Sequence, residues 1–210
     1  MITPAVDLRN QLHPVRHQGH RNSCLAFATS SAHEAKIAAV EHLSVEYLFF
    51  QGAARMVTGA TKGLTLAAVA DALLTEGQPP EQAWPYTPQA VDPWTVPAIS
   101  PPFHKATLTP GQADFDWIVA ALDAGRPVVL GLVITDAFYR PDPAGIVDDG
   151  NAVIERGGHA VLAVGHGAAT TGQSALLIRN SWGDLWGLNG HAWLPQTYVR
   201  RQLHEAAMVT

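Results

Sequence analysis

Cysteine is almost absent from this chain. The 210 residues include one, Cys24, so no disulfide can form within the chain. A fold without such cross-links depends on its core for stability and is typical of a reducing compartment.

Clustered basic charge and long apolar runs are also absent. The chain has 13 Lys and Arg against 18 Asp and Glu, and basic residues do not cluster beyond Arg200 and Arg201. This composition indicates no nucleic-acid partner. No apolar run is long enough to span a membrane, and the N-terminus lacks the basic and apolar segments of a signal peptide. We therefore expect no membrane association and a cytoplasmic location.

The apolar fraction, in contrast, is large. Hydrophobic residues make up 47% and charged residues 15% of the chain, which suits one globular domain. Helical patterns, with Asn22 and Thr65 as expected N-caps, lie mostly in the first half of the chain, at 22–41, 44–56, 65–77 and 113–125. Strand patterns rich in Val, Leu and Ile follow a proline-rich crossing, at 127–135, 158–165, 174–181 and 191–195. This segregation predicts an α+β fold with a helical lobe and a β lobe.

Cys24 is expected in the first turn of the helix that starts after Asn22. Free backbone N–H groups and the positive end of the helix dipole lie there, and both favour a thiolate. The alternative is a small, buried and inert core residue, which is the usual role of a free cysteine.

Two polar residues far downstream favour a catalytic role for Cys24 over that of an inert core residue. His159 begins an apolar strand and Asn180 ends another. A thiol, an imidazole and an amide are the parts of a triad in which the thiol attacks, the imidazole moves protons and the amide orients the ring. His166 also ends a strand pattern and competes with His159 for the role of base.

Four stretches in order resemble the papain/cathepsin family of cysteine peptidases, and its prokaryotic branch without disulfides in particular. They are "PVRHQGHRNSCLAF", "TKGLTLAAVADALLTEGQPPEQAWPY", "GGHAVLAVGHG" and "IRNSWGDLWGLNGHAWLP". Together they span nearly the whole chain, so the resemblance implies a papain-like fold of two lobes with a cleft between them. Residues 1–210 would form a single domain, with the helical lobe at about 10–110 and the β lobe at about 111–210. The resemblance also suggests an N-terminal strand that crosses over.

The resemblance assigns four residues to the reaction. Cys24 matches the nucleophile, His159 the base and acid, and Asn180 the residue that orients the imidazole. Gln18 matches the glutamine whose side-chain N–H, with the backbone N–H of Cys24, faces the developing oxyanion.

Three more residues are assigned to the substrate side of the cleft. Gly63 matches the glycine whose backbone pairs with an extended peptide. Leu64 is expected to line an apolar subsite. Trp182 matches the indole that shields the hydrogen bond between His159 and Asn180.

The chain departs from the family pattern beside the nucleophile. Arg21 and Asn22 stand where relatives usually carry Cys-Gly, and the absent cysteine normally joins a disulfide. Leu25 replaces the tryptophan after the nucleophile, and Lys62 replaces the first glycine of a pair. These changes bear on substrate preference and rate.

Two other groups of titratable residues have simpler interpretations. His13, His17 and His20 could suggest a metal, but Pro and Gly interrupt them and no carboxylate or second thiol accompanies them. Asp148 and Asp149 lack partners for acid–base work and are expected on a solvated rim of the cleft. We therefore expect no metal and no cofactor.

The function that follows from the resemblance is endopeptidase hydrolysis through a Cys24 thioester, with a peptide or protein as substrate. Two alternatives remain open. One is a transpeptidase, deamidase or isopeptidase that acts on a protein partner, and the other is a non-enzymatic peptide-binding module. No inhibitory pro-segment is recognised, so we expect control by an external inhibitor or a fused regulatory domain.

Overall fold

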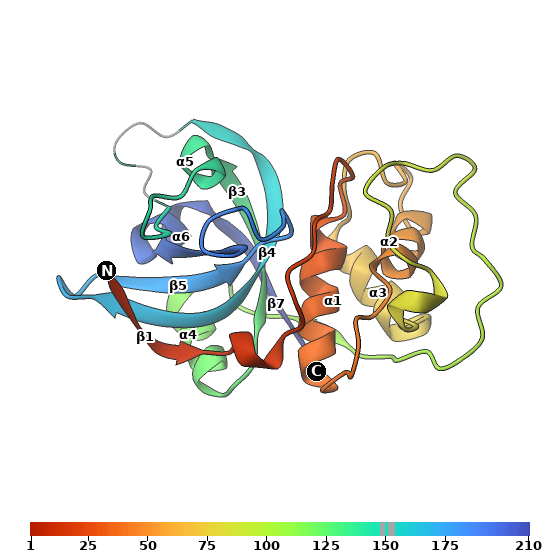
Figure 1. The fold of residues 1–210 in the computed structure, drawn as a ribbon, viewed down its shortest axis with the longest axis horizontal. Coiled ribbons are helices and arrows are strands. Elements are labelled where there is room, and N and C mark those ends of the chain that lie inside the picture. Colours follow the sequence, from red (N-terminus) through yellow and green to blue (C-terminus); the bar gives the residue numbers. More distant parts are fainter. Residues whose placement is uncertain (148–149, 151–153) are drawn as a thin grey trace.

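Two lobes lie side by side in the computed structural model, which describes residues 1–147, 150 and 154–210 (Figure 1). Its helices are α1 (Cys24–Lys36), α2 (Val45–Ala54), α3 (Leu66–Thr75), α4 (Phe115–Asp123), α5 (Asp136–Tyr139) and α6 (Gln196–Gln202). Its strands are β1 (Ile2–Asp7), β2 (Leu108–Pro110), β3 (Val128–Thr135), β4 (Glu155–Ala169), β5 (Ser174–Arg179), β6 (His191–Pro195) and β7 (Leu203–Val209). The predicted α+β class is confirmed.

The strands of the β lobe form one antiparallel sheet in the order β2-β7-β3-β4-β5-β6, and β1 pairs with β4. The N-terminal strand therefore crosses over to the sheet. The chain returns from the helical lobe at β2, which pairs with the C-terminal strand β7. The N-terminal strand β1 and the C-terminal strand β7 are thus both part of the sheet of the β lobe.

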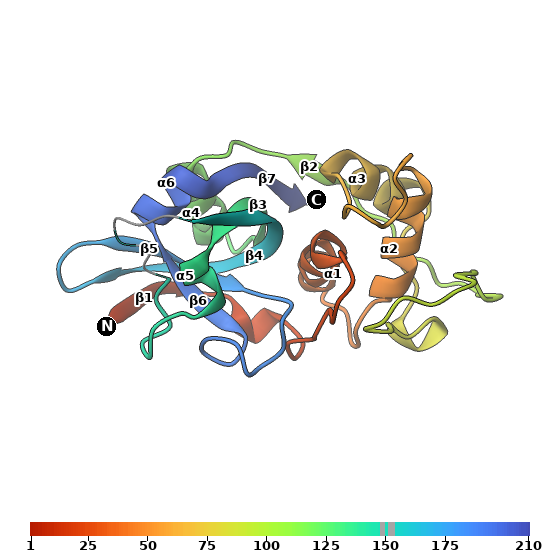
Figure 2. The same ribbon diagram turned by 90° about the horizontal axis from the view of Figure 1, so that it is seen from above.

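Helix α1 is the element that joins the lobes. Figure 2 shows it between the sheet on one side and α2 and α3 on the other. Along β4, alternate residues face opposite cores. Ala160 and Leu162 belong to the core shared with the three helices, and Val161 and Ala163 belong to the core beneath α4 and α6. Burial on both faces explains why this strand reads as a continuous apolar run.

The predicted helix starts hold for α2 and α3 but not for α1. The side chains of Ser44 and Thr65 cap α2 and α3 by accepting the N–H groups of Tyr47 and Ala68. The prediction of Asn22 as the α1 cap is wrong. Its side-chain amide donates to the carbonyl of Thr61 instead, and Ser23 holds the N-cap position without a capping hydrogen bond.

Helix α1 also ends earlier than the predicted residue 41. Its last helical residue is Lys36, and Ala38 adopts a left-handed φ of 48°. The buried carboxylate of Glu34 accepts the N–H of Leu43, which pulls the following loop back over the helix end. Among the described residues, no helix is long and apolar enough to cross a membrane.

Candidate active site

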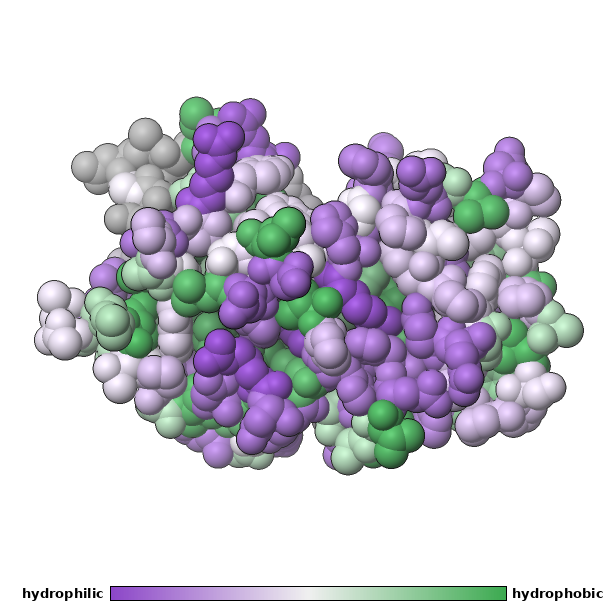
Figure 3. Space-filling model, in the orientation of Figure 1, coloured by the Kyte–Doolittle hydropathy of each residue, from purple (hydrophilic) through white to green (hydrophobic). Residues whose placement is uncertain are grey.

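A cavity of about 400 Å³ lies between the lobes. The space-filling view shows a notch between them at one edge of the molecule (Figure 3). The helical lobe contributes Cys24, Gly63 and Leu64 to its lining, and the sheet contributes His159 and Glu205. The cleft thus brings the expected nucleophile and the expected base to facing walls.

Cys24 is the first residue of α1 and is partly buried. Burial alone raises the pKa of its thiol. The hydrogen bond to His159, the charge of that imidazole, and the backbone N–H groups of Ala160 and Leu25 together outweigh burial, so the pKa lies below the ordinary value of a thiol. A thiolate is therefore favoured at this helix terminus.

His159 is a buried residue of β4, and Asn180 follows β5. Nε2 of His159 lies 2.7 Å from Oδ1 of Asn180, which also accepts the N–H of Ser181 at 2.8 Å. An amide oxygen can only accept, so Nε2 carries a proton and Nδ1 is left for the thiol. The amide therefore sets both the tautomer and the orientation of the ring.

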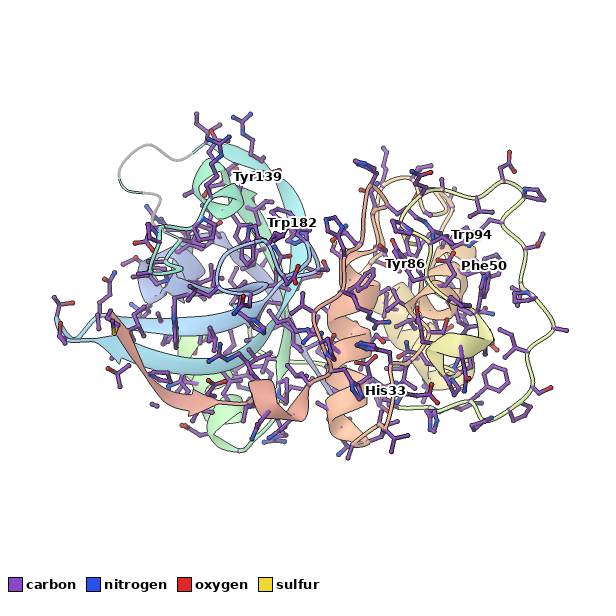
Figure 4. All side chains as sticks on the ribbon, viewed as in Figure 1. His33, Phe50, Tyr86, Trp94, Tyr139 and Trp182 are labelled. Carbon is purple, nitrogen blue, oxygen red and sulfur yellow. The ribbon has the colours of Figure 1, made fainter. Side chains whose placement is uncertain are left out.

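Aromatic side chains cover this imidazole. The ring of Trp182 lies 4.8 Å from that of His159, and Phe138 approaches both. The ring of Tyr139 stacks on that of Trp182 with the ring centroids 5.3 Å apart, and Figure 4 labels both residues. Sequence reasoning missed Phe138 and Tyr139, because they lie on the short helix α5, which has no clear sequence signal.

Gln18 is buried beside the end of β5. Its Oε1 accepts from the hydroxyl of Ser181 at 2.6 Å, and its Nε2 donates to the carbonyl of Arg21 at 2.8 Å. One N–H of the amide is therefore engaged and the second is left for another acceptor. Through Ser181 and Asn180 the amide is connected to the imidazole of His159.

The three expected substrate-side residues occupy different places. Gly63 and Leu64 line the cavity, and Gly63 has a φ of +81°, which favours glycine. Leu64 packs against Gly52 of α2, where a Cβ would lie 2.8 Å from a Leu64 methyl. Trp182 is not among the described residues that line the cavity and packs against His159 instead.

Sequence reasoning missed the acidic end of the cleft. Glu205 and its neighbour His204 line the cavity together with Leu132 and Val133. A Cβ on Gly131 would lie 3.4 Å from Oε2 of Glu205, so the carboxylate lies along this glycine. The expected apolar subsite is therefore apolar along its walls and anionic at one end. No sequence signal placed β7 here, because only strand pairing brings it beside β3.

The cleft cavity is not lined by the other histidines singled out in the sequence, which are His13, His17, His20 and His166. His166 pairs with Asp123 at 2.8 Å, away from the residues that line the cleft. His13 contacts the carbonyl of Ala39, and His17 accepts the N–H of Gly19. Among residues 1–147, 150 and 154–210, no group of His, Cys, Asp or Glu is arranged to hold a metal ion. Asp148 and Asp149, expected on the rim, fall outside the described residues.

Solved structures share this fold. Xylellain, a cysteine protease from Xylella fastidiosa, matches with a TM-score of 0.79 at 24% identity, over 100% of this chain and 87% of that one. The bromelain protease of Ananas comosus matches with a TM-score of 0.74 at 18% identity, over 98% and 97%. At such low identity, these matches establish the fold alone.

Sequence comparison identifies the family. Cathepsin R of Mus musculus is 29% identical over 191 residues, which cover 85% of this chain and 55% of that protein. This chain thus spans about half the length of the cathepsins that it matches. The model of the papain family cysteine proteases matches residues 2–209. The chain therefore belongs to the papain family of cysteine proteases.

Proposed function

We propose that this protein hydrolyses peptide bonds through a thioester on Cys24. The observation that carries the proposal is the continuous connection from Gln18 through Ser181 and Asn180 to His159, which faces a thiol of lowered pKa. A nucleophile, a base, an orienting group and an oxyanion donor then share one cleft.

Each group has one role in the reaction. The Cys24 thiolate attacks the scissile carbonyl carbon, and the second N–H of Gln18 and the backbone N–H of Cys24 stabilise the oxyanion. The carbon–nitrogen bond breaks as His159 protonates the leaving amine. A water molecule then loses a proton to His159 and attacks the thioester, which releases the acid and regenerates the thiol.

The lining of the cleft supports a substrate preference. Leu64, Leu132 and Val133 offer aliphatic surface, and Glu205 offers a carboxylate for which the described residues show no ion-pair partner. A side chain with an apolar stem and a cationic end satisfies both features. We therefore propose that the cleft accepts lysine or arginine, in place of the purely apolar residue that the sequence suggests.

Mass spectrometry tests the thioester assignment. Wild type, Cys24→Ala and His166→Ala are incubated with a protein substrate, and separately with an epoxide-type peptide inhibitor that modifies thiols. Wild type and His166→Ala should cleave the substrate and gain one adduct on Cys24. Cys24→Ala should do neither while keeping its fold. His166 serves as the matched control, because it lies on the same strand outside the cleft.

Product masses separate hydrolysis from transpeptidation, deamidation and simple binding. Hydrolysis adds one water per cleaved bond, a transpeptidase joins fragments, and a deamidase changes the mass without cleavage. A binding module would give no product and a slowly reacting thiol. Full turnover by Cys24→Ala would contradict the assignment of the nucleophile.

A further inference from the structure

Arg21 is a buried cation in the short segment between Gln18 and Cys24. Its Nη1 lies 2.6 Å from Oε2 of Glu46 and donates to the carbonyl of Thr87 at 2.9 Å. Thr87 N–H donates to the same Glu46 oxygen at 3.2 Å. Arg21 is 8% exposed and Glu46 1%. Solvent does not screen such a pair, so its geometry is held more firmly than that of a surface pair.

Aromatic rings enclose this ion pair. The guanidinium carbon lies 4.9 Å, 5.3 Å and 4.8 Å from the ring centroids of Phe49, Tyr86 and Trp94. The indole N–H of Trp94 donates to Oε1 of Glu46 at 2.6 Å. Figure 4 shows Tyr86 and Trp94 in the helical lobe. We call Arg21, Glu46, Phe49, Tyr86 and Trp94 the arginine cage.

The arginine cage is hydrogen-bonded to residues on both sides of Arg21, to the backbone of Gln18 and to the side chain of Ser23. The carbonyl of Arg21 accepts Nε2 of Gln18 at 2.8 Å. The hydroxyl of Tyr86 donates to the carbonyl of Gln18 at 2.7 Å, so the Ser23 hydroxyl, also 2.7 Å from it, is the donor in the second bond. The loop that carries Gln18 and leads into Cys24 is therefore held at three points.

We propose that Arg21 is a positioning residue for the oxyanion donors, an inference that rests on the proposed peptidase function. Arg21 does not line the cleft cavity. It acts through its own carbonyl, which accepts one N–H of the Gln18 amide. This bond orients the second N–H of the amide toward the developing oxyanion. The arginine cage also sets where the backbone N–H of Cys24 enters the cleft.

Steady-state kinetics on a double-mutant cycle of Gln18 and Arg21 test this role. Arg21→Met keeps an unbranched apolar stem, although a shorter one, and removes the guanidinium group with its hydrogen-bond donors. It should lower kcat by about 10- to 100-fold with little change in KM, because a misaligned donor fails mainly in the transition state. In Gln18→Ala the donor is already gone, so adding Arg21→Met should cost little more. Alkylation of Cys24 by iodoacetamide builds no oxyanion and should keep its wild-type rate and pH profile.

The matched control is Arg55→Met. Arg55 also joins helices of this lobe, through Asp71 at 2.5 Å and Glu76 at 3.3 Å, but among the described residues its hydrogen bonds do not reach the Gln18 loop. Its kcat should stay at the wild-type value. If Arg21→Met does not fold, Arg21→Lys and Glu46→Gln replace it. Each should give a smaller loss of kcat that again vanishes in the Gln18→Ala background.

Three results would overturn the inference. They are a wild-type kcat in a folded Arg21 variant, losses that multiply with Gln18→Ala, and alkylation that slows in parallel with kcat. A wild-type protein that alkylates rapidly but cleaves no peptide would instead contradict the proposed function. The two failures are therefore distinguishable.

Discussion

The two walls of the cleft are held in place by different physics. On the helical side, buried charges fix the loops around the nucleophile. Arg16 pairs with Glu34 and Glu81, each at 3.1 Å, and Arg21 pairs with Glu46 at 2.6 Å. These loops have little regular structure, so ionic and hydrogen-bonding partners specify their course.

On the sheet side, hydrogen-bonded strands and aromatic packing position the base. His159 pairs in register with Leu132 of β3, and Trp182 and Phe138 pack over its ring. A strand in the middle of a sheet leaves its side chains little freedom. We therefore expect the nucleophile wall to respond to changes of charge, and the base wall to changes of side-chain shape and hydrogen bonding.

The largest effect is expected on the base wall. His159→Ala should lower kcat/KM by about 10⁴-fold or more, because it removes proton transfer. Asn180→Ala should leave measurable turnover, since Trp182 still holds the ring. The double variant should be little worse than His159→Ala alone. Parallel measurement of kcat/KM for the three variants decides this, and losses that simply multiplied would contradict the triad.

On the nucleophile wall, Glu34→Ala should be strongly destabilising. Glu34 is 1% exposed at its side chain, and its removal leaves Arg16 with Glu81 as its remaining partner and the buried N–H of Leu43 without its acceptor. Loss of one partner of a buried pair costs about 3–5 kcal/mol of unfolding free energy. Urea denaturation of the variant checks the magnitude. Arg9→Ala, which breaks an exposed pair with Asp7, is the control and should change stability little.

Acid should weaken this wall through the same residue. Burial raises the pKa of Glu34, but His42, Arg16 and the Leu43 N–H outweigh it and lower the pKa below 4.5. A lowered folded-state pKa contributes stability above the unfolded value, which is lost as the pH falls through the folded-state pKa. Between about pH 5 and 2, the free energy of unfolding of wild type should therefore fall more steeply than that of Glu34→Ala. If the two free energies of unfolding fell in parallel with pH, Glu34 would not be the group that makes wild type sensitive to acid.

The coupling between the walls should be visible in the pH dependence of thiol reactivity. Because the pKa of Cys24 is lowered, iodoacetamide should react rapidly at neutral pH, below the range in which free thiols ionise. His159→Ala removes the main stabilising partner of the thiolate and should move the profile to higher pH. If alkylation of wild type began only above about pH 8, the result would contradict the stabilisation of the Cys24 thiolate by His159.

The smallest effect is expected at the acidic end of the cleft. Glu205→Gln keeps the size of the side chain and removes its charge. It should reduce the preference for a cationic over an uncharged aliphatic substrate side chain by about tenfold, since the carboxylate is partly solvated. Paired fluorogenic peptides that differ at one position measure the ratio. An unchanged ratio would exclude Glu205 from recognition.

The elements that carry the reaction could be predicted because their signals are local. Ser44 and Thr65 cap the helices they precede, and the apolar runs around His159 and before Asn180 are strands. The cap prediction fails for Asn22 because its partner, the carbonyl of Thr61, lies in a loop that is distant in sequence. Whether a polar side chain caps a helix depends on which hydrogen-bond partners the folded chain brings close to it.

The class of fold, the order of its elements and the residue types of a triad could all be predicted from the sequence, because periodicity, caps and residue chemistry are properties of short stretches. The aromatic surroundings of Arg21 beside Glu46, and the position of Glu205 at the end of the cleft, could not be predicted in this way. Those contacts join segments far apart in the chain. Their formation depends on how the sheet and helices pack, which no short stretch of residues specifies.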